Sequence, residues 1–134
     1  MFSADVLDLG SLDIELYKCI TDQIATDKVI ISEKQLLHMK GHHPESYTET
    51  LIELKSTILA PDYIFRDDKH PLTGLVVRRL GSTAGGVYIV LRICTDSEGG
   101  NLTNSVISGW KISEKRLENY IRNKVILYKK DSSC

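Results

Sequence analysis

The chain has 134 residues, 42% of them hydrophobic and 26% charged, and its formal net charge is −1. This length and balance fit one globular domain over residues 1–134, exclude a disordered tail, and allow folding without a metal or disulfide. No apolar run approaches the roughly 18 residues of a membrane-spanning helix, and the acidic start MFSADVLDLG is unlike a signal peptide. Three cysteines without a Cys-x-x-Cys spacing fit a reducing compartment. We therefore expect a cytoplasmic protein with no membrane contact.

The first thirty residues contain two candidate strands. Leu12–Tyr17 alternates apolar and charged residues, which is typical of a half-buried strand, and Val29–Ile31 is a short β-branched run. The segment is compatible with an extra sheet edge or with an oligomer contact.

Two helices are expected next. Ser32 has the character of an N-cap, with Gln35 at the capping-box position, and the helix that it starts should end at Gly41. Pro44 can occupy the first turn of a second helix. Apolar residues at steps of three and four predict that this helix extends from Pro44 towards Leu59.

The remaining chain changes to a β pattern. Turn-forming residues separate short β-rich runs at Tyr63–Phe65, Leu75–Val77, Val87–Ile93 and Ser105–Trp110. Such close spacing favours antiparallel pairing, because parallel strands need long crossovers. Ser113 should cap a helix over Glu114–Asn123, and a final strand is possible at Val125–Tyr128. The predicted fold class is α+β, with N-terminal helices packed on a curved antiparallel sheet of about four strands, plus a basic C-terminal helix.

Charge is unevenly distributed along the chain. Residues 1–70 carry 13 acids and 7 bases, whereas residues 71–134 carry 5 acids and 10 bases. The last stretch holds seven bases, namely Lys111, Lys115, Arg116, Arg122, Lys124, Lys129 and Lys130. This asymmetry is typical of a basic face that meets phosphates, and equally of a solvated helix in which Glu114 and Glu118 lie near Arg122.

His42 and His43 stand at the break between the two predicted helices. Imidazole can move protons near neutral pH, so either could assist cleavage of a phosphodiester. The alternative is a histidine that caps or packs at the helix junction. No Asp, Glu or Cys follows at a spacing that would complete a metal site, so no metal is expected.

Arg92 is a candidate phosphate ligand. Strand alternation puts Ile89, Leu91 and Ile93 on a core face and Arg92 on the other, beside Tyr88. A guanidinium in that position can clamp a phosphate and its developing charge. A surface arginine paired with a cross-strand acid is the alternative.

The next run offers hydroxyls and an aromatic ring. Regular alternation puts Ser105, Ile107 and Gly109 on one face and Ser108 and Trp110 on the other, together with Asn104 and Val106. The serines could bind phosphate or ribose oxygens, and Trp110 could stack on a base. Otherwise Trp110 anchors the core and Ser108 is a buried hydroxyl.

Four segments together resemble a known family: GHHPE at 41–45, PLTGLVV at 71–77, VLRI at 90–93, and the stretch from Asn104 through Lys129. They are similar to the phage-encoded branch of the barnase/EndoU/colicin/RelE nuclease superfamily. The likeness covers about residues 30–130, which makes 31–130 a nuclease-like core and 1–30 a variable extension.

The resemblance implies a metal-independent endoribonuclease without a cofactor, in which the 2′-hydroxyl of the RNA attacks the adjacent phosphate. By this resemblance His43 is general acid or base, Arg92 stabilises the phosphorane charge, and Ser108 contacts the scissile phosphate or ribose. Substrate contacts are expected from Thr73, Ser105, Lys111, Trp110 and His42.

The expected partner is RNA. A cognate antitoxin or immunity protein is a further candidate partner, because domains of the family that the chain resembles occur in phage, mobile-element and toxin systems. Two other classes remain open. One is a non-catalytic RNA- or protein-binding accessory module that keeps the scaffold. The other is a structural domain whose basic helix docks on an acidic partner.

Overall fold

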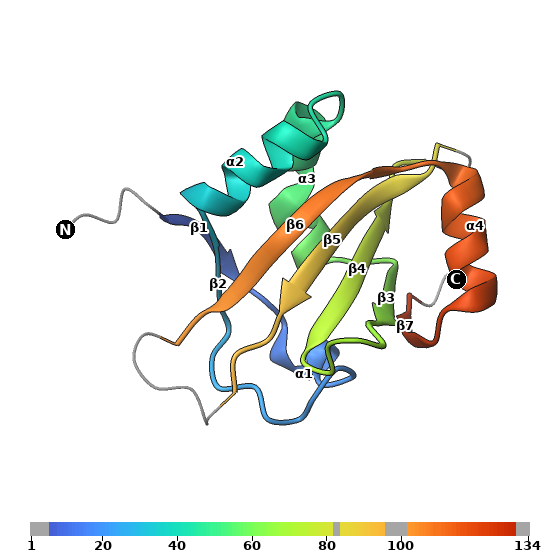
Figure 1. Ribbon diagram of the computed structural model, residues 1–134. Helices are drawn as coiled ribbons and strands as arrows, with labels where there is room; N and C mark the ends of the chain where they lie inside the picture. The colour runs from blue at the N-terminus through green and yellow to red at the C-terminus, as the bar shows by residue number, and fades with distance from the viewer. Residues whose placement is uncertain (1–5, 82–83, 96–101, 131–134) are drawn as a thin grey trace.

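The computed structural model describes residues 6–81, 84–95 and 102–130, which form one mixed sheet with four helices (Figure 1). The strands are β1 Val6–Ser11, β2 Lys28–Ser32, β3 Tyr63–Arg66, β4 Thr73–Arg79, β5 Gly86–Arg92, β6 Asn104–Ile112 and β7 Ile126–Lys129. The helices are α1 Ile14–Tyr17, α2 Glu33–His42, α3 Tyr47–Leu59 and α4 Glu114–Asn123.

The sheet has seven strands in the order β1-β2-β6-β5-β4-β3-β7. The predicted class α+β agrees with this, but the predicted antiparallel sheet of about four strands behind N-terminal helices was wrong. The four expected runs form the antiparallel meander β3-β4-β5-β6, and β1, β2 and β7 extend it. β2 pairs with β6 in parallel. This pairing is possible because the chain between them, which includes α2 and α3, supplies the long crossover that a parallel pair needs.

The segment Leu12–Tyr17 is a second correction, because it forms a helical turn and no strand. The Asp13 side chain accepts a hydrogen bond from the Leu16 backbone N–H at 3.3 Å, and this N-cap starts α1. Tyr17 is fully buried and its hydroxyl donates to the Ile58 carbonyl at 2.7 Å. That carbonyl lies in the last turn of α3, where no helical partner is available. Burial raises the pKa of Tyr17 above its ordinary value.

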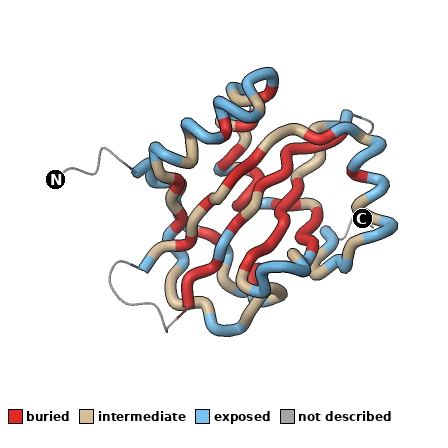
Figure 2. The backbone as a smooth tube through the Cα atoms, in the orientation of Figure 1, coloured by how far each residue is buried: buried red, intermediate tan, exposed pale blue. Residues whose placement is uncertain are grey.

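Two apolar clusters lie on the two faces of the sheet. One packs α1, α2 and α3 against the sheet, and its large members include Tyr17, Met39, Leu54, Ile58, Ile64, Ile89 and Leu91. Leu9 and Leu12 belong to it as well, so the described residues before 30 contribute a sheet edge and part of this core. The second cluster packs α4 against the other face through Tyr63, Phe65, Leu75, Val77, Tyr88, Ile112 and Leu117. Figure 2 shows the buried residues concentrated along the central strands.

α4 is tied to the sheet by an ion pair. The two carboxylate oxygens of Glu114 accept hydrogen bonds from Arg79 Nη1 at 2.9 and 3.1 Å. One of them also accepts the Gly85 backbone N–H at 3.0 Å. These bonds, from Arg79 first, lower the pKa of Glu114. Glu114 is therefore paired with a strand, and not with the helical neighbours that the sequence offered. The Ser113 hydroxyl accepts the Arg116 N–H, which confirms the predicted N-cap.

α4 packs against one end of its face of the sheet, the end that holds Tyr88 and Ile112. The other end of that face carries the C-terminal part of β5 and the N-terminal parts of β4 and β6. This region of the sheet is where the described residues form two neighbouring hollows.

Candidate functional site

Two hollows lie on either side of Arg92. The first, here called the β4 hollow, has a volume of about 470 Å³ and is lined by residues 69–73 with Arg92 and Ile107. The second, the β2 hollow, has a volume of about 450 Å³ and lies between β2, α2 and β6. It too is lined by Arg92 and Ile107. The two hollows therefore meet at the Arg92 side chain.

The sheet register places Arg92 between two hydroxyl-bearing residues. Its Cα partners are Thr73 on β4 and Ser105 on β6, and adjacent strands lie about 4.8 Å apart. Arg92 is exposed, Ser105 is half-buried and Thr73 is buried. Ile89 and Leu91 are fully buried in the opposite cluster, so the predicted alternation of this strand is confirmed. A row of two hydroxyls and a guanidinium thus crosses three strands.

A β-bulge in β6 changes which side chains share this face. Val90 pairs with Ser108 but Leu91 pairs with Val106, which leaves Ile107 as the extra residue. The regular alternation predicted for this run was therefore wrong, because a bulge reverses the facing of every residue beyond it. Ser105 and Ser108 lie on the same face, with Ser108 buried and Val106 in the opposite core.

His70 reaches the β4 hollow from a tight turn after β3. Asp67 accepts the Lys69 backbone N–H at 3.0 Å, and its other carboxylate oxygen lies 3.2 Å from His70 Nδ1. Partial burial alone would raise the pKa of Asp67, but these hydrogen bonds prevail and lower it. When Nδ1 donates to Asp67, Nε2 carries the lone pair of the imidazole. The turn continues into β4 through the Thr73 N–H, which donates to the His70 carbonyl at 3.0 Å.

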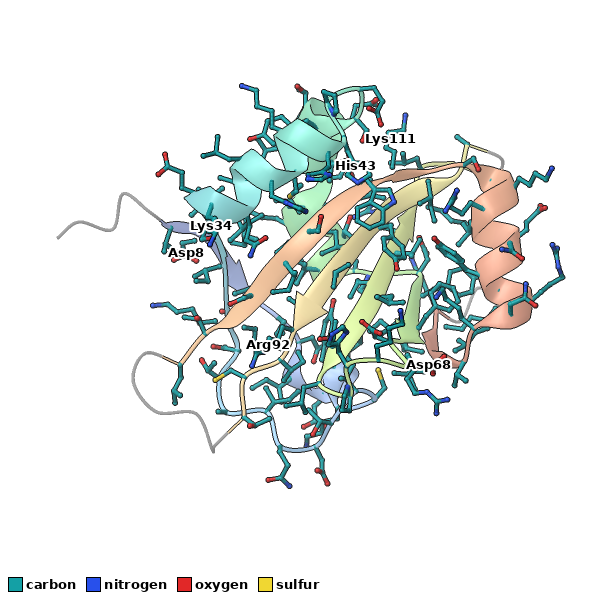
Figure 3. The ribbon with its side chains drawn as sticks, in the orientation of Figure 1. Asp8, Lys34, His43, Asp68, Arg92 and Lys111 are labelled. Carbon is teal, nitrogen blue, oxygen red and sulfur yellow. The ribbon has the colours of Figure 1, made fainter. Side chains whose placement is uncertain are left out.

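His43, the histidine expected beside Arg92, lines neither hollow. It is the C-cap of α2, and its ring stacks on Trp110 with centroids 4.5 Å apart and planes 17° apart. Trp110 pairs with Tyr88, which precedes Arg92 by four residues on β5. At about 3.3 Å per residue, Arg92 lies roughly 13 Å further along the strand. Figure 3 shows His43 near the α2–α3 corner and Arg92 at the far end of β5.

Two further predicted residues also lie away from the hollows. His42 is exposed on α2, with its ring 4.2 Å from that of His38. Lys111 forms an ion pair with Glu49 of α3, Nζ to Oε1 at 3.2 Å. The structure therefore brings together Arg92, Thr73 and Ser105 around the hollows, and it groups His43 with Trp110 elsewhere on the face.

Three basic side chains line the β4 hollow, and no carboxylate is among its lining residues in the described part of the chain. Lys69, His70 and Arg92 contribute to its wall. Of the nearby acids in the described part of the chain, Asp67 is engaged by the turn and Asp68 pairs with Arg66 at 2.9 Å. Charge-assisted hydrogen bonds from such groups suit phosphate oxygens.

The sequence interpretation missed His70 and Lys69. In the sequence, Asp67 and Asp68 indicate only a turn between two β-rich runs. An aspartate three residues before a histidine in a turn can orient the imidazole, and that spacing was the available indication.

No protein-family model, no curated protein and no solved structure matches this chain. Within residues 6–81, 84–95 and 102–130, none of the helices has the length and apolar character needed to cross a membrane. Over the same residues, no group of three or more His, Cys, Asp or Glu side chains is arranged to hold a metal ion.

Proposed function

We propose that the protein binds RNA across the open face of its sheet and cleaves one phosphodiester bond at the β4 hollow without a metal. The observation that carries the proposal is that His70 and Arg92 line the same hollow, with Lys69 beside them. An imidazole can act as general base and a guanidinium can stabilise developing negative charge, two contributions that acid–base cleavage of RNA uses.

In the proposed reaction His70 Nε2 takes the proton of the 2′-hydroxyl while the 2′-oxygen attacks phosphorus. The bond from the 2′-oxygen to phosphorus forms and the bond to the 5′-oxygen breaks. The 5′-oxygen leaves with a proton from the Lys69 ammonium or from water, giving a 2′,3′-cyclic phosphate and a 5′-hydroxyl. Arg92 holds the non-bridging oxygens, where negative charge increases. Asp67 is a positioning residue that orients the ring through Nδ1.

The basic residues of the β4 hollow and the aromatic rings further along the same face of the sheet support RNA as the ligand. Tyr120, Tyr88, Trp110 and His43 form a continuous row of rings, with neighbouring centroids 5.5, 4.8 and 4.5 Å apart. Tyr88 is buried in the core, whereas Trp110, His43 and Tyr120 are half-buried and leave ring surface on which a base of a single strand can stack. Beyond Tyr120, α4 adds a basic hollow of about 380 Å³ lined by Ser113, Lys115, Arg116, Asn119 and Arg122.

The deciding experiment incubates end-labelled single-stranded RNA with the protein in EDTA and resolves the products. Wild type should give fragments that end in a cyclic phosphate. His70→Ala should lower kcat by about 10²–10⁴-fold, and Arg92→Ala by about 10²–10³-fold. Lys55→Ala is the control for loss of an exposed cation, because Lys55 lies on α3 against the opposite face.

The same series tests the assignment of His43. Under the proposal His43→Ala changes kcat by less than about tenfold, since His43 lines neither hollow. Loss of cleavage in His43→Ala with activity retained in His70→Ala would return the catalytic role to His43. Retention of cleavage in both variants would refute imidazole catalysis at this face.

The second candidate function is RNA binding without cleavage, which the row of rings favours on its own. It predicts that wild type retains RNA on a gel without cutting it. Charge reversal at Lys115 and Arg122 tests the α4 contribution to either function. Removing two phosphate contacts should weaken binding and reduce the slope of log K against log salt by roughly 1.4, at about 0.7 per contact. An unchanged slope would mean that RNA does not reach α4.

A further inference from the structure

The β2 hollow differs in chemistry from the β4 hollow. Its polar lining includes the hydroxyls of Ser32, Thr103 and Ser105 and the amide of Gln35, and Ile30 and Ile107 add apolar surface. Arg92 is the one cationic residue among its described lining residues, and it is shared with the β4 hollow. Hydroxyl and amide groups are neutral donors and acceptors, which suit base edges and ribose oxygens better than a second phosphate.

The two hollows have nearly equal volumes and meet at Arg92. A phosphate held by Arg92 carries one nucleoside on each of its two ester oxygens. One nucleoside would then enter the β4 hollow, where the cations lie, and the other would enter the β2 hollow. Each volume falls in the range of about 300–1,000 Å³ that small-molecule sites have.

Gln35 is the residue of the β2 hollow best placed to read a base. It lies in the first turn of α2, where the Ser32 hydroxyl accepts its backbone N–H at 3.2 Å and so fixes its main chain. Its side chain is half-buried, and its amide makes no hydrogen bond within the described part of the chain. A carboxamide presents a donor and an acceptor side by side, the pair that matches the N6 and N7 edge of adenine.

We propose that the β2 hollow is the base-recognition subsite of the bound RNA, that Gln35 reads the base there, and that adenine is preferred. The inference deepens the proposed function and rests on it only in requiring that Arg92 holds an RNA phosphate. It assigns substrate choice to the β2 hollow and bond cleavage to the β4 hollow.

The test uses dinucleoside phosphates with 2′-O-methyl riboses, which cannot be cleaved because the attacking hydroxyl is blocked. The sixteen base combinations are titrated into ¹⁵N-labelled protein, and Kd is read from the backbone amide signals of Gln35 and Ser105. Wild type should prefer adenine at one of the two positions by about 5–150-fold, the range for one bidentate contact to a base. Arg92→Ala should weaken all combinations together.

Variants of Gln35 make the test specific. Gln35→Leu should reduce the adenine preference to less than about twofold while leaving Kd for the other bases within about threefold. Gln35→Glu should shift the preference to cytosine, because a carboxylate accepts from the cytosine amino group. Gln23→Leu is the matched control, since Gln23 is the other glutamine of the chain, lies exposed before β2 and lines neither hollow.

The outcomes separate this inference from the proposed function. An adenine preference that depends on Gln35, found without any cleavage of long RNA, would support the base subsite and refute the nuclease. Cleavage of long RNA with no base preference at the β2 hollow, or with a preference that survives Gln35→Leu, would overturn the subsite and leave the nuclease intact. Absence of dinucleotide binding at millimolar concentration would also overturn the subsite.

Discussion

Asn104, at the start of β6, offers a prediction whose magnitude changes with pH. The residue is fully buried. Its side-chain oxygen accepts the Cys94 backbone N–H at 2.8 Å, and its amide nitrogen donates to the carbonyls of Thr26 and Lys28 at 2.8 and 3.1 Å. One side chain of β6 thus joins the residues just after β5 to the N-terminal end of β2 and the segment before it. These contacts lie beside the β2 hollow. We consider Asn104→Asp, which keeps the shape and removes both donors.

The magnitude follows from the two ways in which the aspartate can respond. As a carboxylate it would face two carbonyl oxygens without water, so the folded protein should favour the protonated acid. Keeping an acid of ordinary pKa about 3.9 protonated at pH 7 costs about 4 kcal/mol, at 1.36 kcal/mol per pH unit. The protonated acid still lacks one of the two donated hydrogen bonds, which adds about 1 kcal/mol. The variant should therefore lose about 5 kcal/mol of unfolding free energy at pH 7.

The loss of unfolding free energy should shrink in acid. An aspartate whose pKa is raised on folding destabilises the native state progressively as pH rises above the pKa of the unfolded chain. At pH 4 keeping the acid protonated costs only about 0.5 kcal/mol, and with the missing hydrogen bond the expected loss is about 1–2 kcal/mol. Urea denaturation at the two pH values, followed by the fluorescence of Trp110, the single tryptophan, measures both differences from wild type. Asn119→Asp on the exposed side of α4 is the control. A penalty that is equal at pH 4 and pH 7 would refute the reasoning.

Three further changes test how the helices are held. Tyr17→Phe should lower the free energy of unfolding by about 1–2 kcal/mol, since it leaves the Ile58 carbonyl buried without a donor; no loss in urea denaturation would contradict this. Glu114→Gln should cost stability at pH 7 but progressively less as pH falls below about 4.3, because the lowered pKa of Glu114 makes its stabilisation disappear in acid; a pH-independent difference would exclude the ion pair as the cause. Gly85→Ala should lower Tm by at least about 5 °C, because φ is +76° and the added Cβ would collide with a backbone carbonyl. Calorimetry checks the last of these, and an unchanged Tm would show that the turn relaxes freely.

Much of the local structure could be predicted from the sequence. The caps at Ser32 and Ser113, the helices that they start and the four central strands all follow from residue pattern. The strand predicted over Leu12–Tyr17 was wrong, because the N-cap of Asp13 outweighed an apolar–polar alternation over only six residues. A period of two over so few residues is weak where a side chain can cap a turn.

The candidate site was predictable only in part. Alternation along β5 identified Arg92 as the side chain that leaves the core, and register then placed Thr73 and Ser105 beside it. The family resemblance predicts His43 as the acid or base that acts with Arg92. In the structure His70 lines the hollow with Arg92, and the His43 ring stacks on Trp110. Which imidazole reaches a given sheet position depends on how loops close, and sequence distance does not encode this.

The amino-acid sequence by itself determined where the chain turns, which helices it caps and which face of β5 is apolar, because those features arise from neighbours within a few residues. Only the tertiary structure decided that β2 lies parallel to β6, that β1 and β7 close the sheet edges, and that a bulge at Ile107 turns Ser105 and Ser108 to one face. These depend on pairings between residues far apart in the chain, where a register shift of one residue reverses every side chain.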